Sequence, residues 1–248
     1  MNRILFEFGN IIIYSYGFFV AMGFLIAIFL ILQETKKVNL ETNKVFDLLI
    51  VILLGGLFGA RSLFVLLSWD YYSLNILKVF ALHEGGLAIQ GGIFGGIVAG
   101  AIFMKIKKLP IFFTADIVAL YLPVSQAIGR VGCLLNGCCY GKEIHSGIGI
   151  NFPGETVVRF PSQPYYTIAF LVLFLFLRRI YDNKSFNGQI FSIYLICYGI
   201  LRVGLDFFRG DELVSYFGIT LSQILGIVTC FSGLVLFLCL KVISLRKK

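Results

Sequence analysis

Residues 46–67 read FDLLIVILLGGLFGARSLFVLL, and the only charged positions are Asp47 near the start and Arg61 near the end. An α-helix rises about 1.5 Å per residue, so about 20 apolar residues cross the hydrocarbon core of a bilayer. This stretch is long enough to do so. It therefore predicts a membrane-spanning helix, and similar stretches elsewhere in the chain decide the fold class.

Seven apolar stretches cover most of the 248 residues. Six are long enough to span a bilayer, and the fifth is short. Their expected bounds are Ile11–Leu32, Phe46–Leu67, Leu87–Met104, Ile111–Leu135, Tyr165–Leu177, Gly188–Phe208 and Leu221–Leu240. The segments between them are too short for a separate soluble domain. We therefore expect an all-α, polytopic membrane protein with seven transmembrane helices, in which residues 1–248 form a single integral-membrane domain.

Composition and charge agree with this class. Hydrophobic residues make up 58% of the chain and charged residues 14%, which excludes a soluble protein. A net charge of +8 would indicate nucleic-acid binding in a soluble protein, but here Lys and Arg are concentrated in alternate loops, as in cytoplasmic loops of membrane proteins. No nucleic-acid partner is expected. The alternation requires the fifth stretch to span, and it predicts an outside N-terminus and a cytoplasmic C-terminus.

Three arginines, Arg61, Arg130 and Arg202, lie inside the expected spans. Each costs about 3 kcal/mol at the centre of a bilayer unless it meets a partner, water or an anionic ligand. In the expected topology all three lie in the outer half of the membrane. The other polar residues at this depth are Tyr16, Gln90, Asn136 and Asp206. Because a guanidinium binds phosphate oxygens through paired hydrogen bonds, a phospholipid headgroup is the expected ligand.

The sixth stretch places four polar residues, Tyr198, Arg202, Asp206 and Arg209, on one helix face, since they are spaced by four, four and three positions. Arg202 and Asp206 are expected to form an ion pair. A pair that merely neutralises itself does not explain the two other arginines. Asp116, near the cytoplasmic start of the fourth stretch, is expected to cap or anchor that helix.

Glycines recur through the third stretch, which includes Gly91, Gly92, Gly95, Gly96 and Gly100. Small residues at this spacing let helix backbones approach closely within a membrane. We therefore expect close packing of the third helix on a neighbour. No nucleotide-binding loop is indicated.

Three cysteines, Cys133, Cys138 and Cys139, are expected at or near the outer face. Cys133 and either of the others can form a disulfide, whereas adjacent cysteines rarely bond to each other. A zinc site would need a fourth ligand such as His145, and the spacing matches none of the standard pairs. No metal is therefore expected. The remaining cysteines, Cys197, Cys230 and Cys239, lie in apolar stretches and are interpreted as small hydrophobic residues.

Residues 129–141 read GRVGCLLNGCCYG and resemble the signature G-R-x-G-N-F-x-N-G-E-x-x-G of the prolipoprotein diacylglyceryl transferase family. The resemblance covers nearly the whole chain, because further motifs follow in the family's order. They are Tyr16-Gly17, Gly59-Ala60-Arg61, Gly85-Gly86, Gly91-Gly92, Asp116 with Pro123, Pro161-Ser162-Gln163, Tyr198-Gly199, Arg202, Asp206-Phe207-Phe208-Arg209 and Ser222-Gln223.

The resemblance implies a multi-pass enzyme of the bacterial plasma (inner) membrane with its active site toward the outer leaflet. Such an enzyme moves the diacylglyceryl group of phosphatidylglycerol to the lipobox cysteine thiol in a prolipoprotein signal peptide. A thioether forms, glycerol phosphate leaves, and neither cofactor nor metal is required.

Site residues follow from the same resemblance. Arg130 and Arg202 would bind and stabilise the headgroup phosphate. Asp206, where the family has Glu, would orient Arg202 or accept a proton. The other substrate-binding positions implied are Tyr16, Arg61, Gln90, Asn136, Gly141, Ser162, Gln163, Tyr198 and Arg209.

The chain departs from the family pattern at several positions. Gln90 stands where a His is common, and a Gln side chain does not titrate. Cys133 and Cys138 replace Asn and Glu of the signature, and Phe160 and Tyr166 stand where His and Glu often occur. The identity of a general base is therefore open.

Three alternatives also stay open. A paralogous phospholipid-dependent transferase would use another acceptor. A membrane thiol oxidoreductase would need a cycling pair among the outer cysteines. A transporter would be expected to have polar residues along a continuous path through the bilayer, whereas here the polar residues gather in the outer half of the membrane.

Overall fold

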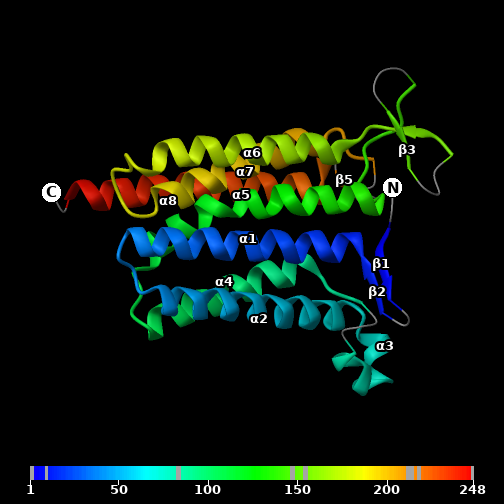
Figure 1. The fold of residues 1–248 in the computed structure, drawn as a ribbon, viewed down its shortest axis with the longest axis horizontal. Helices are drawn as coiled ribbons and strands as arrows, with labels where there is room; N and C mark the ends of the chain where they lie inside the picture. The colour runs from blue at the N-terminus through cyan, green and yellow to red at the C-terminus, as the bar shows by residue number, and fades with distance from the viewer. Residues whose placement is uncertain are drawn as a thin grey trace. The chain divides into compact units, whose positions relative to one another are not determined.

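The structure is a computed structural model, and it describes residues 3–8, 11–81, 85–145, 149–152, 156–210, 215–216 and 219–246. Seven helices in these ranges are long and apolar enough to cross a membrane (Figure 1). They are α1 (Ser15–Lys37), α2 (Thr42–Leu67), α4 (Ile89–Ile106), α5 (Ile111–Asn136), α6 (Ser162–Tyr181), α7 (Gln189–Asp206) and α8 (Leu221–Arg246). The prediction of a seven-helix polytopic protein is confirmed. The fifth expected span is a 20-residue helix, α6, and is long enough to cross.

The shorter elements include three two-stranded sheets. The other elements are α3 (Trp69–Ser73), η1 (Ile76–Phe80), β1 (Ile4–Phe8), β2 (Ile11–Tyr14), β3 (Ile150–Asn151), β4 (Val158–Arg159), β5 (Ser215–Tyr216) and β6 (Ile219–Thr220). The expected helical start at Ile11 was wrong, because residues 11–14 pair antiparallel with β1. Three consecutive β-branched isoleucines favour this extended conformation. The helix begins at Ser15, whose amide donates to the carbonyl of Arg3 at 2.9 Å.

The chain divides into two compact units. Unit 1 comprises Met1–Ile31 and Ala115–Lys248, and therefore most of α1 and α5 together with α6, α7 and α8. Unit 2 comprises Leu32–Thr114, with α2, α3, η1 and α4.

In unit 2, α2 and α4 pack with their backbones almost in contact. A Cβ atom on Gly59 would collide with the carbonyl oxygen of Gly91, and one on Gly95 would collide with that of Gly55. Only glycine allows this approach. The expected close packing of the third span is therefore present, and its neighbour is α2.

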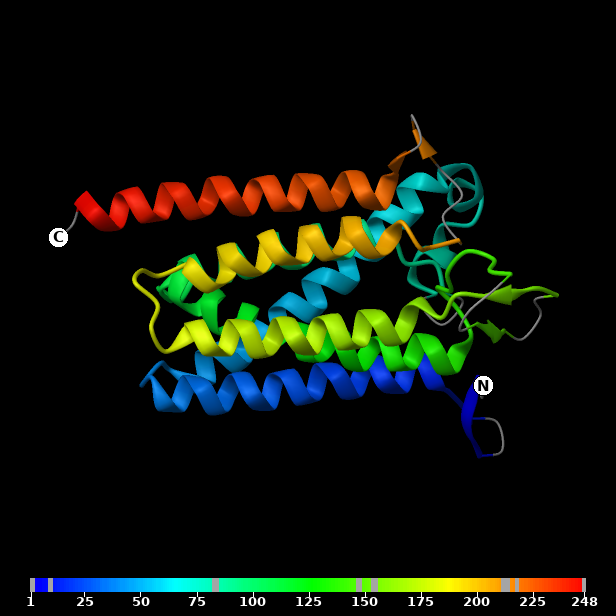
Figure 2. The ribbon, with the colours of Figure 1, turned by 90° about the horizontal axis from the view of Figure 1, so that it is seen from above.

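In unit 1, α7 runs beside α8, as Figure 2 shows in yellow-orange and red. The N-terminus of α7 is fixed by Asp116 of α5, which is fully buried. Its carboxylate accepts hydrogen bonds from the amides of Gly188 and Phe191 at 2.9 and 3.0 Å and from Lys184 Nζ at 3.0 Å. Asp116 was expected to cap or anchor its own helix, and it instead caps the N-terminus of α7. A carboxylate there is stabilised by the unpaired amides and the dipole of α7.

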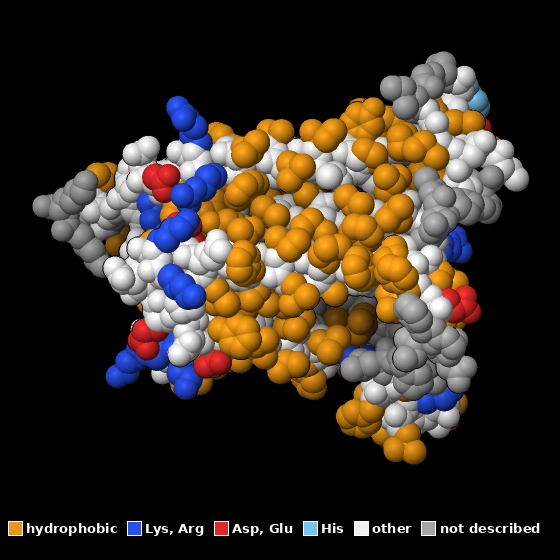
Figure 3. Space-filling view, in the orientation of Figure 1, with side chains coloured by type: hydrophobic (Ala, Val, Ile, Leu, Met, Phe, Trp, Pro, Cys, Tyr) orange, Lys and Arg blue, Asp and Glu red, His pale blue; other side chains and the backbone are white. Residues whose placement is uncertain are grey.

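Large apolar side chains cover the outer faces of the helices (Figure 3). Phe58, for example, is 76% exposed and Leu25 is 65% exposed. Side chains of this kind are stable when they face lipid, because lipid chains are as apolar as they are. Lys and Arg side chains gather at helix ends in the same view.

Candidate active site

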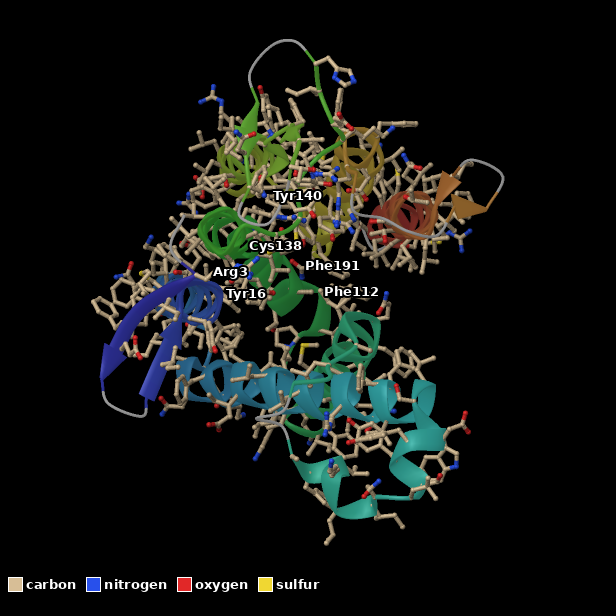
Figure 4. The ribbon with its side chains drawn as sticks, turned by 90° about the vertical axis from the view of Figure 1, so that its right-hand side faces the viewer. Arg3, Tyr16, Phe112, Cys138, Tyr140 and Phe191 are labelled. Carbon is tan, nitrogen blue, oxygen red and sulfur yellow. The ribbon has the colours of Figure 1, made fainter. Side chains whose placement is uncertain are left out.

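One end of unit 1 gathers the ends of α5 and α7 with the beginnings of α1 and α6. The amide of Lys142, which follows α5, donates to the carbonyl of Phe208, which follows α7, at 2.8 Å. Arg3 Nε, which precedes α1, donates to the carbonyl of Asn136 at 3.2 Å. Figure 4 looks onto this end. Most of the site residues expected in unit 1 lie here.

Gly141 occupies the crossing of these segments. Its amide donates to the carbonyl of Phe160 at 2.7 Å, and it forms an antiparallel bridge with Arg209. A Cβ atom at position 141 would lie 2.6 Å from the carbonyl oxygen of Phe208 and 2.8 Å from that of Phe160. Backbone atoms cannot yield to this clash as a flexible side chain would. Gly141 therefore joins the loop after α5 to the loops around α6 and α7.

Asp206 is the centre of a buried polar cluster at the end of α7. Its side chain is 2% exposed. One carboxylate oxygen lies 3.0 Å from Arg202 Nε, so the expected ion pair forms. The other oxygen accepts a hydrogen bond from the Tyr166 hydroxyl and lies 3.7 Å from Arg209 Nη1. Asp206 therefore holds two arginines in place: Arg202 on α7 and Arg209 in the loop after α7.

Tyr166 of α6 was named in the sequence only as a departure from the family pattern, yet it connects the cluster to Arg130. The Arg130 guanidinium carbon lies 4.0 Å from the centroid of the Tyr166 ring. This is a close cation–π contact. Only the packing of α5 against α6 brings these two residues together.

Within the described ranges, the Arg130 guanidinium has no hydrogen bond to the protein and no carboxylate partner within 4.0 Å. Arg130 is only partly exposed. A cation in this position, inside a helix long enough to span a membrane, is costly unless it meets a partner, water or an anionic ligand. The arrangement leaves its planar set of donors available for phosphate oxygens.

Tyr198, expected to bind substrate, belongs to an aromatic row beside the cluster. Its ring stacks on Phe170 at 6.2 Å and on Tyr194 at 5.8 Å, measured between ring centroids. The Tyr194 hydroxyl accepts a hydrogen bond from Gln126 Nε2 at 2.9 Å. These ring contacts pack α6 against α7 next to Tyr166, whose ring also contacts Phe170.

Ser162 and Gln163 open α6 and are both buried. Ser162 Oγ donates to the carbonyl of Cys139, and Gln163 Nε2 donates to that of Cys138, each at 2.6 Å. Gln163 Oε1 is buried and has no hydrogen-bond partner among the described residues. Both side chains therefore fix the turn after α5.

The three outer cysteines come together in that turn. Their sulfur atoms all lie within 4.8 Å of one another, and Figure 4 labels Cys138 at this end of the unit. Gly137 and Cys139 have φ values of 71° and 61°, which turn the chain back so that Cys138 and Cys139 reach Cys133. All three are free thiols. The sequence offered pairs of these cysteines, and the structure brings all three together.

The neighbouring thiols lower the pKa of Cys138. Hydrogen bonds from the Cys133 and Cys139 thiols, with smaller contributions from Asn136 and Arg130, lower the pKa of the Cys138 thiol against the opposing effect of burial. A thiolate is the form that binds metals and reacts as a nucleophile.

Tyr16 lies at the start of α1, beside the last turns of α5. A Cβ atom on Gly132 would lie 3.4 Å from the Tyr16 carbonyl oxygen, so the two helices are close there. The Tyr16 side chain is 47% exposed. It interacts electrostatically with Cys133 and with Arg130, so it borders both the thiols and the free guanidinium.

The two remaining expected site residues, Arg61 and Gln90, lie in unit 2, and their grouping with unit 1 stays a prediction. Arg61 is 5% exposed and its guanidinium lies 5.2 Å from the Tyr72 ring centroid. It donates at 2.6 to 3.3 Å to five backbone carbonyls, those of Lys78, Val79, Ala81, Gly85 and Gly86. Arg61 therefore holds the end of η1 and the residues just before α4 in place. Gln90 is exposed in the first turn of α4.

A profile of the prolipoprotein diacylglyceryl transferase family matches residues 3–239 of this chain. The chain belongs to this family. It is 32% identical over 235 residues to the phosphatidylglycerol–prolipoprotein diacylglyceryl transferase of Clostridioides difficile, across 95% of this chain and 94% of the relative. The protein of the same name from Finegoldia magna is 33% identical over 238 residues, covering 95% and 94% of the two chains. That from Clostridium tetani is 31% identical over 244 residues, covering 96% and 97%.

In this member of the transferase family, the signature residues make structural contacts at the candidate site. Arg130, at its start, projects toward Tyr166, and Gly141, at its end, closes the loop against the segments around α6 and α7. Between them, Cys133 and Cys138 stand at signature positions for Asn and Glu and form the thiol cluster with Cys139.

Proposed function

We propose that this chain transfers the diacylglyceryl group of phosphatidylglycerol to the thiol of the lipobox cysteine of a prolipoprotein. The names of its relatives give this donor and this class of acceptor. The observation that carries the proposal is Arg130, which contacts the Tyr166 ring and has no hydrogen-bonding or ion-pairing partner for its guanidinium among the described residues. This is the group that a phosphate monoanion in a lipid would bind.

In the proposed reaction, the acceptor thiol loses its proton to water, and its sulfur attacks the glyceryl carbon that carries the phosphate. A carbon–sulfur bond forms, the carbon–oxygen bond to phosphate breaks, and glycerol phosphate leaves with the electron pair. Negative charge grows on the phosphate as it departs. Arg130, already positioned over Tyr166, stabilises that charge without reorganisation, which is the kind of electrostatic effect that accelerates group transfer.

Asp206 acts in this scheme as a positioning residue. Its two oxygens already face Arg202, Arg209 and the Tyr166 hydroxyl. Asp206 therefore holds Arg202 toward the headgroup.

We further propose that the chain acts as one transferase domain in the bacterial plasma membrane, with its substrate site toward the outer leaflet. The bias of Lys and Arg between alternate loops supports this orientation. The acceptor is then a prolipoprotein whose signal peptide lies in the membrane beside the donor lipid.

Purified protein tests the proposal in liposomes that contain phosphatidylglycerol and a synthetic lipobox peptide. Mass spectrometry should show a peptide that gains one diacylglyceryl group in a thioether link. Liposomes with phosphatidylethanolamine as the only phospholipid, and a peptide with Ser in place of the lipobox Cys, are the controls. Folded protein that leaves the Cys peptide unmodified in phosphatidylglycerol would refute the proposed function.

A further inference from the structure

The sulfur atoms of Cys133, Cys138 and Cys139 have the spacing of a metal site. Zinc binds thiolate sulfur at about 2.3 Å, so three sulfurs on one ion lie about 3.8 to 4.0 Å apart. All three sulfurs here lie within 4.8 Å of one another, and those of Cys138 and Cys139 are 3.6 Å apart. Shifts of a few tenths of an ångström would complete the geometry.

The surrounding structure holds these sulfurs in place. Cys133 is buried in the last turns of α5, while Cys138 and Cys139 follow in a turn whose carbonyls accept hydrogen bonds from Gln163 and Ser162. These two donors come from α6 and are themselves buried. Supporting contacts of this kind fix the orientation of metal ligands.

The donor set selects the kind of ion. Three thiolates favour a soft or borderline cation such as Zn²⁺ and exclude Mg²⁺ and Ca²⁺, which bind oxygen. Zinc with three thiolates carries one net negative charge, and Arg130 lies within electrostatic range of Cys138 and Cys139 to offset it. Among the described residues the cluster has three members, so a tetrahedral ion would keep its fourth position open.

We propose that Cys133, Cys138 and Cys139 bind a zinc ion whose open position takes the thiol of the acceptor. The second half of this statement rests on the proposed function. On coordination the acceptor thiol loses its proton to water. Its sulfur then attacks the glyceryl carbon and the phosphate leaves, so the product thioether and glycerol phosphate balance the substrates and no oxidant is needed. Metal coordination deprotonates a thiol outright.

This step answers a question that the sequence leaves open. Gln90 stands where an imidazole is common in the family, and no titrating base replaces it at that position. A metal that deprotonates the acceptor thiol removes the need for such a base. Two of the three thiols occupy signature positions close to Arg130, where the leaving phosphate is expected.

The first test is the zinc content of full-length protein purified without oxygen, measured by mass spectrometry of the metal. We expect about one zinc ion per chain. Cys133→Ser, Cys138→Ser and Cys139→Ser should each lose most of it, whereas Cys239→Ser, on an exposed position of α8, should keep it. Wild-type protein that stays zinc-free after incubation with zinc, or that contains a disulfide within the cluster, would overturn the proposal.

The second test does not depend on the folding of variants. Zinc is removed from wild-type protein with a chelator and replaced by Co²⁺, whose thiolate charge-transfer absorption reports the number of bound sulfurs. A lipobox peptide with Cys should increase this absorption, and the same peptide with Ser should not. Equal spectra with both peptides would overturn the assignment of the open position to the acceptor.

Transfer measured on the same samples separates this inference from the proposed function. Metal-free protein should lose transfer and regain it when zinc is restored. Full transfer by metal-free protein would overturn the zinc proposal while the proposed function stands. Bound zinc without transfer by any sample would overturn the proposed function and leave the metal site.

Discussion

Replacement of Arg130 by alanine removes the guanidinium that we assign to the headgroup phosphate. A hydrogen bond to a charged group contributes about 1.5 to 3 kcal/mol, so a paired contact contributes about 3 to 6 kcal/mol. Each 1.4 kcal/mol corresponds to about a tenfold change in rate. We therefore expect kcat/KM for transfer to fall by a factor of about 10² to 10⁴ in Arg130→Ala.

The same substitution removes the cation–π contact with Tyr166, at 4.0 Å. Such a contact contributes about 0.5 to 2 kcal/mol to stability, so its loss should destabilise the protein without preventing folding. Thermal unfolding in detergent measures this effect separately from transfer. The matched control is Arg178→Ala on α6. It removes a surface ion pair with Asp182, just after that helix, and should leave transfer unchanged.

Arg130→Lys separates the charge from its geometry. Lysine keeps the positive charge but cannot reproduce the planar pair of donors, so it should recover only a small part of the lost rate. Transfer is followed as thioether-linked peptide at several phosphatidylglycerol concentrations. Folded Arg130→Ala protein with wild-type kcat/KM would refute the assignment of the phosphate to this residue.

Three further substitutions test other parts of the site. Asp206→Asn should destabilise the protein by about 3 to 5 kcal/mol, since the partly buried Arg202 and Arg209 lose the buried carboxylate that they face, and thermal unfolding should show a lower midpoint than wild type. Gly141→Ala should abolish transfer or folding, because the added Cβ would collide with backbone atoms. The control Gly204→Ala should be tolerated, because a Cβ there has open space. Wild-type transfer by Gly141→Ala would contradict the close backbone packing around position 141. Gln90→Ala should weaken transfer only partly, and complete loss with intact protein would show that this amide is indispensable.

The membrane-spanning helices could be predicted because their signal is local. Length and apolar composition decide whether a segment crosses a bilayer, and the close packing of α4 followed from its glycines. Even the short fifth span was predicted, from the distribution of basic residues. The error at Ile11–Tyr14 arose because pairing with β1, whose residues lie outside the apolar stretch, decided the conformation there.

The sequence predicted which residues form the candidate site, but it did not predict most of the contacts among them. The pair Arg202 and Asp206 was visible because both lie on one helix, four residues apart. The role of Tyr166, which connects Asp206 to Arg130, depends on three different helices and leaves no local pattern. Asp116 likewise caps a helix that begins 73 residues later in the chain, at Gln189.

The thiol cluster could not be predicted from the sequence either. Six cysteines are visible in the sequence, but their spacing matches no standard zinc motif. The positive φ values at Gly137 and Cys139, and the hydrogen bonds from the start of α6, bring three of them together. A metal site built on such a turn is recognised only from its three-dimensional geometry.

The stoichiometry of the two products tests the central claim most directly. Wild-type protein is incubated with lipobox peptide and with phosphatidylglycerol labelled in both its glyceryl backbone and its headgroup. We expect one glycerol phosphate released for each thioether-linked peptide formed, with the backbone label on the peptide and the headgroup label in solution. Release of glycerol phosphate without peptide modification, or modification of the peptide by an ester-linked acyl chain alone, would contradict diacylglyceryl transfer at this site.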